Sequence, residues 1–316
     1  MRPMTDFNPS APTIPAAPSP PASEAAPPAG LAKGYAAIIF AIIIWSGWIV
    51  ATRHQVHVAT PLDISLLRYC LPALVLAPVW LRRGIVPRGE DWRLLMVMAV
   101  GWGGGFVWLT AKGLETVPAS LFGPMVPATL PLVVSLWDRV QGGVPISGTR
   151  GAGLALILGS IGLIVGPALV QGEAGVLAGA PYLLLAAIGW ASFTIAFRRS
   201  TLTGLEATAY VCLWSTPALI VAGLLSDSKL GALDWDMIAW LVVSQGLLSG
   251  ICAVACFAYA VRHLGAARTS SFTSLVPMGA AIGGWLVLGE TVGPLGWAAV
   301  VCACLGVAVV NGALGR

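Results

Sequence analysis

Charged residues are scarce in this chain. Of its 316 residues, 17 are Lys or Arg and 13 are Asp or Glu, so only 9% are charged. A typical soluble domain has about 25%, because a soluble fold needs polar surface to cover its core. The shortage excludes an ordinary soluble enzyme and a nucleic-acid-binding protein. Together with the 57% of apolar residues, it indicates an all-α integral membrane protein with many spans.

Metal-site spacings and catalytic motifs are also missing. The six cysteines lie in apolar runs, and Cys252 and Cys256 do not have the Cys-x-x-Cys spacing of zinc and redox sites. We expect them to be small buried apolar side chains. The sequence contains no P-loop, no His-Glu-x-x-His, no Gly-x-Ser-x-Gly and no dinucleotide fingerprint. We therefore predict no catalytic residue, no metal ion and no cofactor.

Prolines crowd the first 32 residues, among Ala and Ser, and the first long apolar run starts only after Lys33. Such a segment has little to bury and no helical period. We predict a disordered cytoplasmic tail over residues 1–32. It is not a signal peptide, because no apolar core follows the first basic residue.

Apolar runs long enough to cross a membrane follow the tail. A spanning helix needs about 20 largely apolar residues, and we predict ten transmembrane helices with short connections and no soluble domain. The predicted spans lie at about residues 34–52, 62–81, 92–111, 117–137, 150–170, 174–195, 206–225, 236–260, 269–288 and 292–312.

Lys and Arg fall mainly on one side of these spans. The other side has only Arg53, Lys112 and Lys229, and Arg68 lies inside the second span. Because cytoplasmic loops are rich in Lys and Arg, the more basic side is predicted to be cytoplasmic, with both termini on it. The cations on that side are Arg2, Lys33, Arg82, Arg83, Arg88, Arg93, Arg139, Arg150, Arg198, Arg199, Arg262, Arg268 and Arg316.

The chain repeats itself once. A shift of 145 residues aligns Trp45 with Trp190 and Arg53 with Arg198, and farther along the shift becomes 150. A five-residue insertion in the eighth span would explain this change of register. The further aligned positions are Pro72 with Pro217, Gly101 with Gly246, Gly105 with Gly250, Ser120 with Ser270 and Pro127 with Pro277.

Each half of this repeat contains five predicted spans. Five is an odd number, so the second half must cross the membrane in the opposite direction to the first. Inverted repeats with a binding site at their interface are typical of secondary transporters, because two equivalent halves can exchange conformations and so open a cavity to either side in turn.

Five short strings stand at fixed places along the two halves: Trp45-Ser46-Gly47, Leu67-Arg68, Gly265-Ala266-Ala267-Arg268-Thr269-Ser270-Ser271, Leu275-Val276-Pro277 and Leu288-Gly289-Glu290. With ten spans in two five-helix halves, they resemble the EamA branch of the drug/metabolite transporter superfamily. The first half differs from that pattern, because Trp137-Asp138-Arg139 stands where a Leu-Gly-Glu string is usual.

This resemblance implies two EamA repeats of five helices each, over residues 33–170 and 171–316. It implies a central cavity built by spans 1–4 and 6–9, with spans 5 and 10 at the periphery. It also implies a carrier of amino acids, other metabolites, sugars or toxic amphiphiles.

Polar and aromatic side chains within the cavity-forming spans are the candidate substrate contacts. For the tryptophans among them, a cavity wall and helix packing are both open readings, with the cavity favoured for Trp45 and Trp190 and packing for the rest. The candidates are Trp45, Ser46, Trp48, Arg68, Tyr69, Trp102, Trp190, Trp214, Gln245, Tyr259, Ser271 and Thr273.

Arg68 is the most informative of these candidates. It lies about 9 Å into its span at 1.5 Å per residue, where an unpaired charge costs at least about 2.5 kcal/mol. It could hold a substrate carboxylate or other anion. Alternatively, it forms a structural ion pair with Asp63, Glu115 or Glu290, or extends towards the interface.

Prolines and paired glycines interrupt several spans. Pro72, Pro127, Pro217 and Pro277 free backbone carbonyls and are predicted to kink their helices, either as hinges or by shaping the cavity. The Gly101/Gly105 and Gly246/Gly250 pairs have the spacing that lets helices approach closely.

From these patterns we predict a multi-pass inner-membrane secondary transporter, not an enzyme, that exports an amino acid or related small metabolite by alternating access. The alternative is an integral-membrane enzyme acting on a lipid or isoprenoid substrate, but the loops offer no paired acids for a metal–phosphate site. No acid lies near the centre of a span, which disfavours a carboxylate proton relay. The expected partners are the substrate and the bilayer, with no nucleic acid; the oligomeric state is left open, a monomer included.

Overall fold

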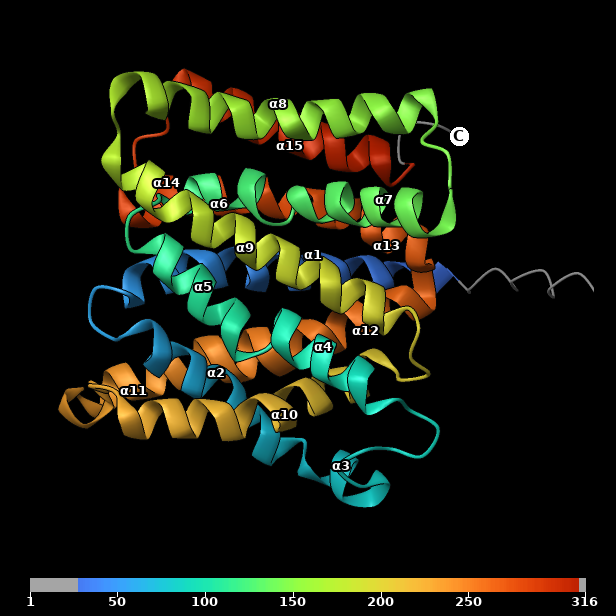
Figure 1. Cartoon of the computed structure of the whole chain (residues 1–316), viewed down its shortest axis with the longest axis vertical. Helices are drawn as coiled ribbons and strands as arrows, with labels where there is room; N and C mark the ends of the chain where they lie inside the picture. The colour runs from blue at the N-terminus through green and yellow to red at the C-terminus, as the bar shows by residue number, and fades with distance from the viewer. Residues whose placement is uncertain (1–27, 313–316) are drawn as a thin grey trace, which may run out of the picture.

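In the computed structural model, which describes residues 28–312, all regular secondary structure of that part of the chain is helical (Figure 1). The first half contains α1 (Pro28–Gln55), α2 (Pro61–Val75), α3 (Ala77–Arg83), α4 (Trp92–Trp102), α5 (Gly104–Leu114), α6 (Ala119–Met125), α7 (Thr129–Gly142) and α8 (Gly148–Gln171). The second half contains α9 (Ala174–Phe197), α10 (Gly204–Leu225), η1 (Leu230–Ala232), α11 (Trp235–Leu241), η2 (Val242–Cys252), α12 (Ala253–Leu264), α13 (Ala266–Phe272), η3 (Thr273–Leu275), α14 (Val276–Leu288) and α15 (Pro294–Val310).

Consecutive helices that continue in one direction can be counted as one span. Counted in this way, the described part of the chain has eight helical segments that are long and apolar enough to cross a membrane. The bent pair α2 and α3 would make a ninth span. The last predicted run is the 17-residue α15, which is shorter than these. The count of ten spans therefore remains a prediction.

The first helix begins earlier than expected. It starts at Pro28, inside the segment predicted as tail up to residue 32. Proline suits the first turn of a helix because its missing N–H would have no helical partner there, and Ala29, Leu31 and Ala32 favour continuation. The tail prediction for residues 1–27 lies outside the described residues.

The second predicted span, 62–81, is broken. Helices α2 and α3 meet at an angle of 59°, with Leu76 between them. Pro78 in the first turn of α3 has no N–H to donate to the preceding turn, so the helix cannot continue straight. Pro72 lies inside α2, so the break follows it rather than falling on it.

The third spans of the two halves differ in form. In the first half, Gly103 separates α4 from α5, and a Cβ there would collide with the Ala99 carbonyl and Ser215 Oγ. In the second half, α11, η2 and α12 run on as one stretch of 30 residues, and η2 is a π-helix. A π-helix accommodates inserted residues within a continuous helix, which agrees with the insertion inferred for the eighth span.

Two ends of the bundle can be distinguished in Figure 1. Helices α1 and α9, the first of each half, begin at opposite ends. The α1–α2, α5–α6 and α10–α11 connections lie at one end, and the α3–α4, α7–α8 and α9–α10 connections lie at the other. Lys112, in the last turn of α5, and Lys229, directly before η1, therefore belong to the first end, and most of the predicted cytoplasmic cations belong to the second. The start of α1 and the end of α15 both lie at the α3–α4 end.

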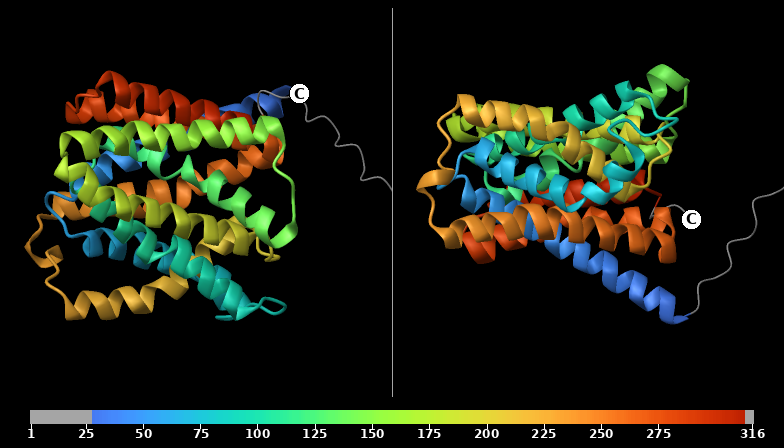
Figure 2. Two further views of the ribbon diagram at one scale, coloured as in Figure 1. Left: turned by 45° about the horizontal axis from the view of Figure 1, so that its top comes forward. Right: turned by 90° about the horizontal axis from the view of Figure 1, so that it is seen from below.

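Helices α8 and α15 lie side by side at one edge of the bundle (Figure 2). Gly153 and Gly306 sit against each other's backbone, and a small core around Ile157 and Ala303 joins the pair. This is the peripheral place that the resemblance implied for spans 5 and 10.

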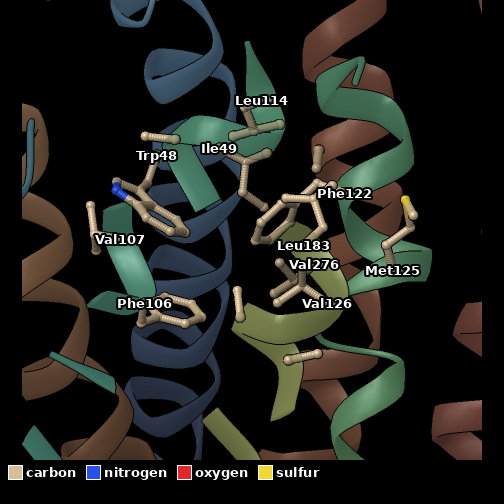
Figure 3. Close-up of a cluster of buried hydrophobic side chains, with 14 of the residues drawn as sticks. Trp48, Ile49, Phe106, Val107, Leu114, Phe122, Met125, Val126, Leu183 and Val276 are labelled. Carbon is tan, nitrogen blue, oxygen red and sulfur yellow. The ribbon is translucent and has the colours of Figure 1, made fainter. Parts of the chain in front are cut away.

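The main core lies between α1, α5, α6, α9 and α14. Figure 3 shows Trp48 in this core beside Phe106, with its indole nitrogen turned away from Phe122 and Met125. The Trp48 ring stacks on Phe106 and meets Phe122 edge to face, at centroid distances of 6.3 and 6.0 Å. These contacts fix one side of the Trp48 ring, so the nitrogen faces the other half of the chain.

The glycine and proline predictions have mixed outcomes. Gly101 lies directly against the Gly189 carbonyl, so α4 and α9 approach closely. Gly246 and Gly250 pack on α2 in the same way. Gly105 is different, because a Cβ there would meet only the Val100 carbonyl of α4, in the same predicted span, and the expected contact between spans is wrong for that residue.

Two of the four prolines lie at helix interruptions. Pro127 lies between α6 and α7, and Pro277 lies in the first turn of α14, directly after η3. Pro72 and Pro217 lie inside continuous helices. Any hinge role of these residues remains a prediction.

Candidate functional site

Arg68 of α2 lies at the boundary between the two halves. Its side chain is 6% exposed, and Nη1 donates to the Gln245 carbonyl at 2.6 Å and to Ser249 Oγ. Its guanidinium carbon lies 5.4 Å from the centre of the Trp48 ring, a cation–π arrangement. All three partners are neutral groups.

The ion pair considered for Arg68 is not formed. Asp63 accepts from the backbone N–H groups of Thr60 and Lys229 and from the Ser228 hydroxyl. Glu115 pairs with Lys112 at 2.6 Å, and Glu290 pairs with Arg53 at 3.4 Å. Within residues 28–312, no carboxylate forms an ion pair with Arg68. The structural ion-pair interpretation is therefore wrong for the acids that were considered.

Gln245 of η2 is the centre of a buried hydrogen-bond network. Its Oε1 accepts from Trp48 Nε1 at 2.6 Å, and its Nε2 donates to Thr52 Oγ1 at 2.9 Å and to Gln55 Oε1 at 2.7 Å. Gln55 in turn donates to Ser244 Oγ at 2.8 Å. The network joins α1 of the first half to η2 of the second, with every polar atom named here paired.

Helix geometry explains why these side chains converge. Trp48, Thr52 and Gln55 are spaced four and three residues apart, so they lie on one face of α1. Gln245 and Ser249 are four residues apart in the wider turns of η2, and Ser249 Oγ donates back to the Gln245 carbonyl at 3.0 Å. We call Trp48, Arg68 and Gln245, with Thr52, Gln55 and Ser249, the central cluster.

Thr52, Gln55 and Ser249 were missed by sequence reasoning. All three are fully buried. The predicted first span ends at residue 52, three residues before Gln55. The four- and three-residue spacing of Trp48, Thr52 and Gln55 is the signal that places these last two residues on the same helix face as Trp48; Ser249 has no such signal.

Several predicted site residues lie close to the central cluster. Tyr69 donates from its hydroxyl to the Trp102 carbonyl at 2.6 Å. Trp102 packs on Phe193 with centroids 4.9 Å apart, and Trp190 meets Phe106 at 6.0 Å. Phe106 also stacks on Trp48. Aromatic rings from α4, α5 and α9 therefore continue from the cluster into the second half.

The remaining predicted residues lie elsewhere. Trp214 donates from Nε1 to the Ile85 carbonyl at 3.1 Å, in the α3–α4 connection. Tyr259 is 38% exposed and stacks on His263 near the end of α12. Two more lie between α1 and the second half: Trp45 packs on Phe257, and Ser46 donates to the Val276 carbonyl at 3.3 Å. The last two lie between α12 and α14. Thr273 donates to the Ser270 carbonyl at 2.6 Å, and Ser271 lies two residues before Thr273.

Each end of the bundle has a hollow. One at the α3–α4 end, of about 550 Å³, is lined by Arg82, Arg83, Arg88 and Thr201. One at the α1–α2 end, of about 230 Å³, is lined by Arg53, His54, His57 and Glu290. Among the described residues, no three His, Cys, Asp or Glu side chains come together as metal ligands.

The family of the chain follows from comparison with known proteins. A model of the EamA-like transporter family matches it twice, over residues 32–166 and 177–312. The chain is 25% identical over 276 residues to a protein of Escherichia coli named "uncharacterized inner membrane transporter YedA", covering 84% of this chain and 86% of that protein. Proteins of that name in two further Escherichia coli strains match equally.

One solved crystal structure has a similar fold. The match covers 90% of this chain and 99% of the chain in that structure, with a TM-score of 0.59 at 17% sequence identity. The two family matches together cover most of the chain and occupy one half each. The chain therefore belongs to the EamA-like transporter family, within the drug/metabolite transporter superfamily.

Proposed function

We propose that this protein is a secondary transporter, not an enzyme, that exports a small metabolite with an anionic group, such as an amino acid or related compound. The two halves exchange conformations, so that the central cluster between them faces each side of the membrane in turn. Two family repeats with a polar cluster at their boundary support this mechanism, because carriers with internal repeats bind substrate there.

The observation that carries the proposal is the position of Arg68. A guanidinium buried in a membrane span costs at least about 2.5 kcal/mol, and neutral hydrogen-bond partners offset that cost without cancelling the charge. Here it is held by a carbonyl, a hydroxyl and an indole ring, all neutral. A substrate carboxylate would supply the missing negative charge, and the adjoining aromatic rings would cover the apolar part of the substrate.

The proposed orientation follows from the cations. We assign the α3–α4 end to the cytoplasm and call it the inner end, and we call the α1–α2 end the outer end. Ten spans then cross the membrane as two inverted five-helix repeats, over 33–170 and 171–316, with both termini inside. The name of the Escherichia coli relative supports an inner-membrane location.

The absence of a mid-membrane acid bears on energy coupling. The acids of the described residues lie at the helix ends and in the connections. Without a central carboxylate proton relay, export would proceed by exchange, by diffusion down the substrate gradient, or by coupling through a peripheral acid such as Glu290.

The test of function is transport by the purified protein in lipid vesicles, with a panel of labelled amino acids, organic anions, cations and neutral sugars. We expect counterflow of one or more carboxylate-bearing compounds, lost in Arg68→Gln. Transport of cations or sugars alone would contradict the assignment of Arg68 to a substrate anion.

The test of orientation is cysteine labelling in intact cells. Cysteines introduced near residues 84–90 and 199–204 should react only after the membrane is permeabilised, whereas those near 114–116 and 228–232 should react from outside. Finding both sets on the same side would contradict the inverted arrangement.

A further inference from the structure

Three ion pairs of the described residues join the halves, and two of these lie at opposite ends of the bundle. At the outer end, Arg53 of α1 pairs with Glu290 after α14, with Nε and Oε1 3.4 Å apart. At the inner end, Arg198 after α9 pairs with Asp138 of α7 through two hydrogen bonds of 2.9 and 3.3 Å. In each pair, one residue belongs to the first half and the other to the second.

The two ion pairs are related by the internal repeat. The shift of 145 residues that aligns Trp45 with Trp190 also aligns Arg53 with Arg198. Asp138 belongs to the string that replaces Leu-Gly-Glu in the first half, two residues before the position aligned with Glu290. The first half therefore lacks the glutamate but keeps an acid that reaches the equivalent arginine.

A second set of contacts occupies similar places in the two halves, at a shift of 143 residues instead of 145. Thr60 and Asp63 form a capping box at the start of α2, and Thr203 and Glu206 form one at the start of α10. Each acid also contacts the opposite half. Asp63 accepts from Ser228 Oγ at 2.6 Å at the outer end, and Glu206 pairs with Arg83 at 2.9 Å at the inner end.

We infer that the Arg53–Glu290 and Arg198–Asp138 pairs are reciprocal latches that decide which face of the carrier opens, an inference that rests on the proposed alternating access. Opening the outer face requires the halves to part between α1 and α14, which breaks the first pair. Opening the inner face parts α7 from α9 and breaks the second. Both pairs are formed here, so the conformation is closed at both ends and the central cluster is buried.

The two latches differ in strength. The Arg53 and Glu290 side chains are 20% and 11% exposed, and Glu290 also accepts from the Ala119 and Ser120 backbone N–H groups at 2.9 and 3.1 Å. These N–H groups belong to the first turn of α6, where a negative charge is favoured. The Arg198 and Asp138 side chains are 47% and 24% exposed, so water weakens their attraction more. The outer latch is the tighter of the two, and the inner face opens more readily.

The experiment is hydrogen exchange measured by mass spectrometry on the full chain in lipid nanodiscs. Arg53→Gln removes the ion pair of the outer latch and so weakens it, while Glu290 keeps its hydrogen bonds to the start of α6. We expect exchange to rise about fivefold in segments 55–60 and 114–118, and to fall in segments 84–91 and 199–203. Arg198→Gln should do the reverse, with a smaller rise of about two- to fivefold.

The fall at the far end is the decisive readout. A contact that merely stabilises the fold would raise exchange near the substitution and leave the far end unchanged or raised. A latch shifts the population towards the state in which the far end is closed. The double variant, Arg53→Gln with Arg198→Gln, should return both ends towards the pattern of the unsubstituted protein.

Matched controls lie in the first half alone. Lys112→Gln breaks the Lys112–Glu115 pair at the outer end, and Arg139→Gln removes a contact to the Gly143 carbonyl at the inner end. Neither contact crosses between the halves, so neither variant should change exchange at the far end. A far-end response to Lys112→Gln, or none to both Arg53→Gln and Arg198→Gln, would overturn the proposal.

This readout requires no substrate, so it is independent of the transport assay. Reciprocal exchange without transport of any tested compound would support the latches and count against the proposed substrate class. Transport without reciprocal exchange would support the function and overturn the latches.

Discussion

At the two ends of the bundle, equivalent positions of the two halves carry the same kind of contact, whereas at its centre they carry different side chains. Arg53 and Arg198 each reach an acid of the opposite half. At the centre, the repeat equivalent of Arg68 is Leu213, and that of Gln245 is Val100, which is 69% exposed.

This difference fits the two tasks of a carrier. Closing one face and then the other is the same operation performed twice, so both halves keep its contacts. Binding a substrate with one negative group needs one cation, and a second buried guanidinium would add a desolvation cost without a partner. At the centre, equivalent positions of the two halves therefore carry different side chains, whereas at the ends they make the same kind of contact.

The largest expected effect comes from removing the central charge. Arg68→Gln should cost about 2–5 kcal/mol in transport of a carboxylate-bearing substrate, because the buried anion loses its partner. Arg68→Lys should cost less, since it keeps the charge but loses the planar fork. Initial transport rates in vesicles, at equal protein content, measure both effects.

The matched control is Leu213→Met, at the repeat-equivalent position, which should transport normally. If Leu213→Met impaired transport as much as Arg68→Gln, the centre would be functionally symmetric and the comparison would fail.

The next effect is on stability instead of transport, and it comes from the hydrogen-bond network. Gln245→Leu leaves the Trp48 indole N–H and the Gln55 carbonyl oxygen without their partner, and each buried unpaired group costs about 1–3 kcal/mol. We expect a clear fall in the temperature of thermal unfolding in detergent. Val100→Leu, at the equivalent exposed position, should change stability by less than about 0.5 kcal/mol, and equal losses in the two variants would argue against a one-sided centre.

The first turns of α2 and α10 should show the smallest effect. Thr60→Ala and Thr203→Ala each remove the side chain that accepts from the third residue of the helix, and such a cap contributes about 1 kcal/mol. Because the two capping boxes stand at the starts of α2 and α10, the second helix of each half, the two losses should be nearly equal. Chemical unfolding of both variants checks this, and a loss confined to one of them would show that the ends are not equivalent.

Much of this architecture could be predicted from the sequence. Long apolar runs, the Trp45–Trp190 register and the distribution of Lys and Arg depend only on composition and order along the chain. They located the helices, the two halves and the two ends. The sequence also shows Trp137-Asp138-Arg139 in place of the usual Leu-Gly-Glu string, but it does not show that Asp138 pairs with Arg198.

The interior contacts could not be predicted in the same way. In an almost wholly apolar helix, periodicity does not distinguish a lipid-facing side from a protein-facing one, and the predicted first span ends before Gln55. Arg68 is bound by the Gln245 carbonyl, and a backbone partner leaves no trace in residue types. The break at Gly103 depends on Ser215, which lies far away in sequence.

The shortness of α15 has a consequence for the surrounding bilayer. At 1.5 Å per residue, its 17 residues extend about 25 Å, less than the roughly 30 Å of a typical hydrocarbon core. Its neighbour α8, with 24 residues, is long enough to cross at a tilt. If α15 is the tenth span, as predicted, the lipid along the edge formed by these two helices would have to be thinner to meet its ends, and acyl-chain length should influence where in the membrane this protein resides.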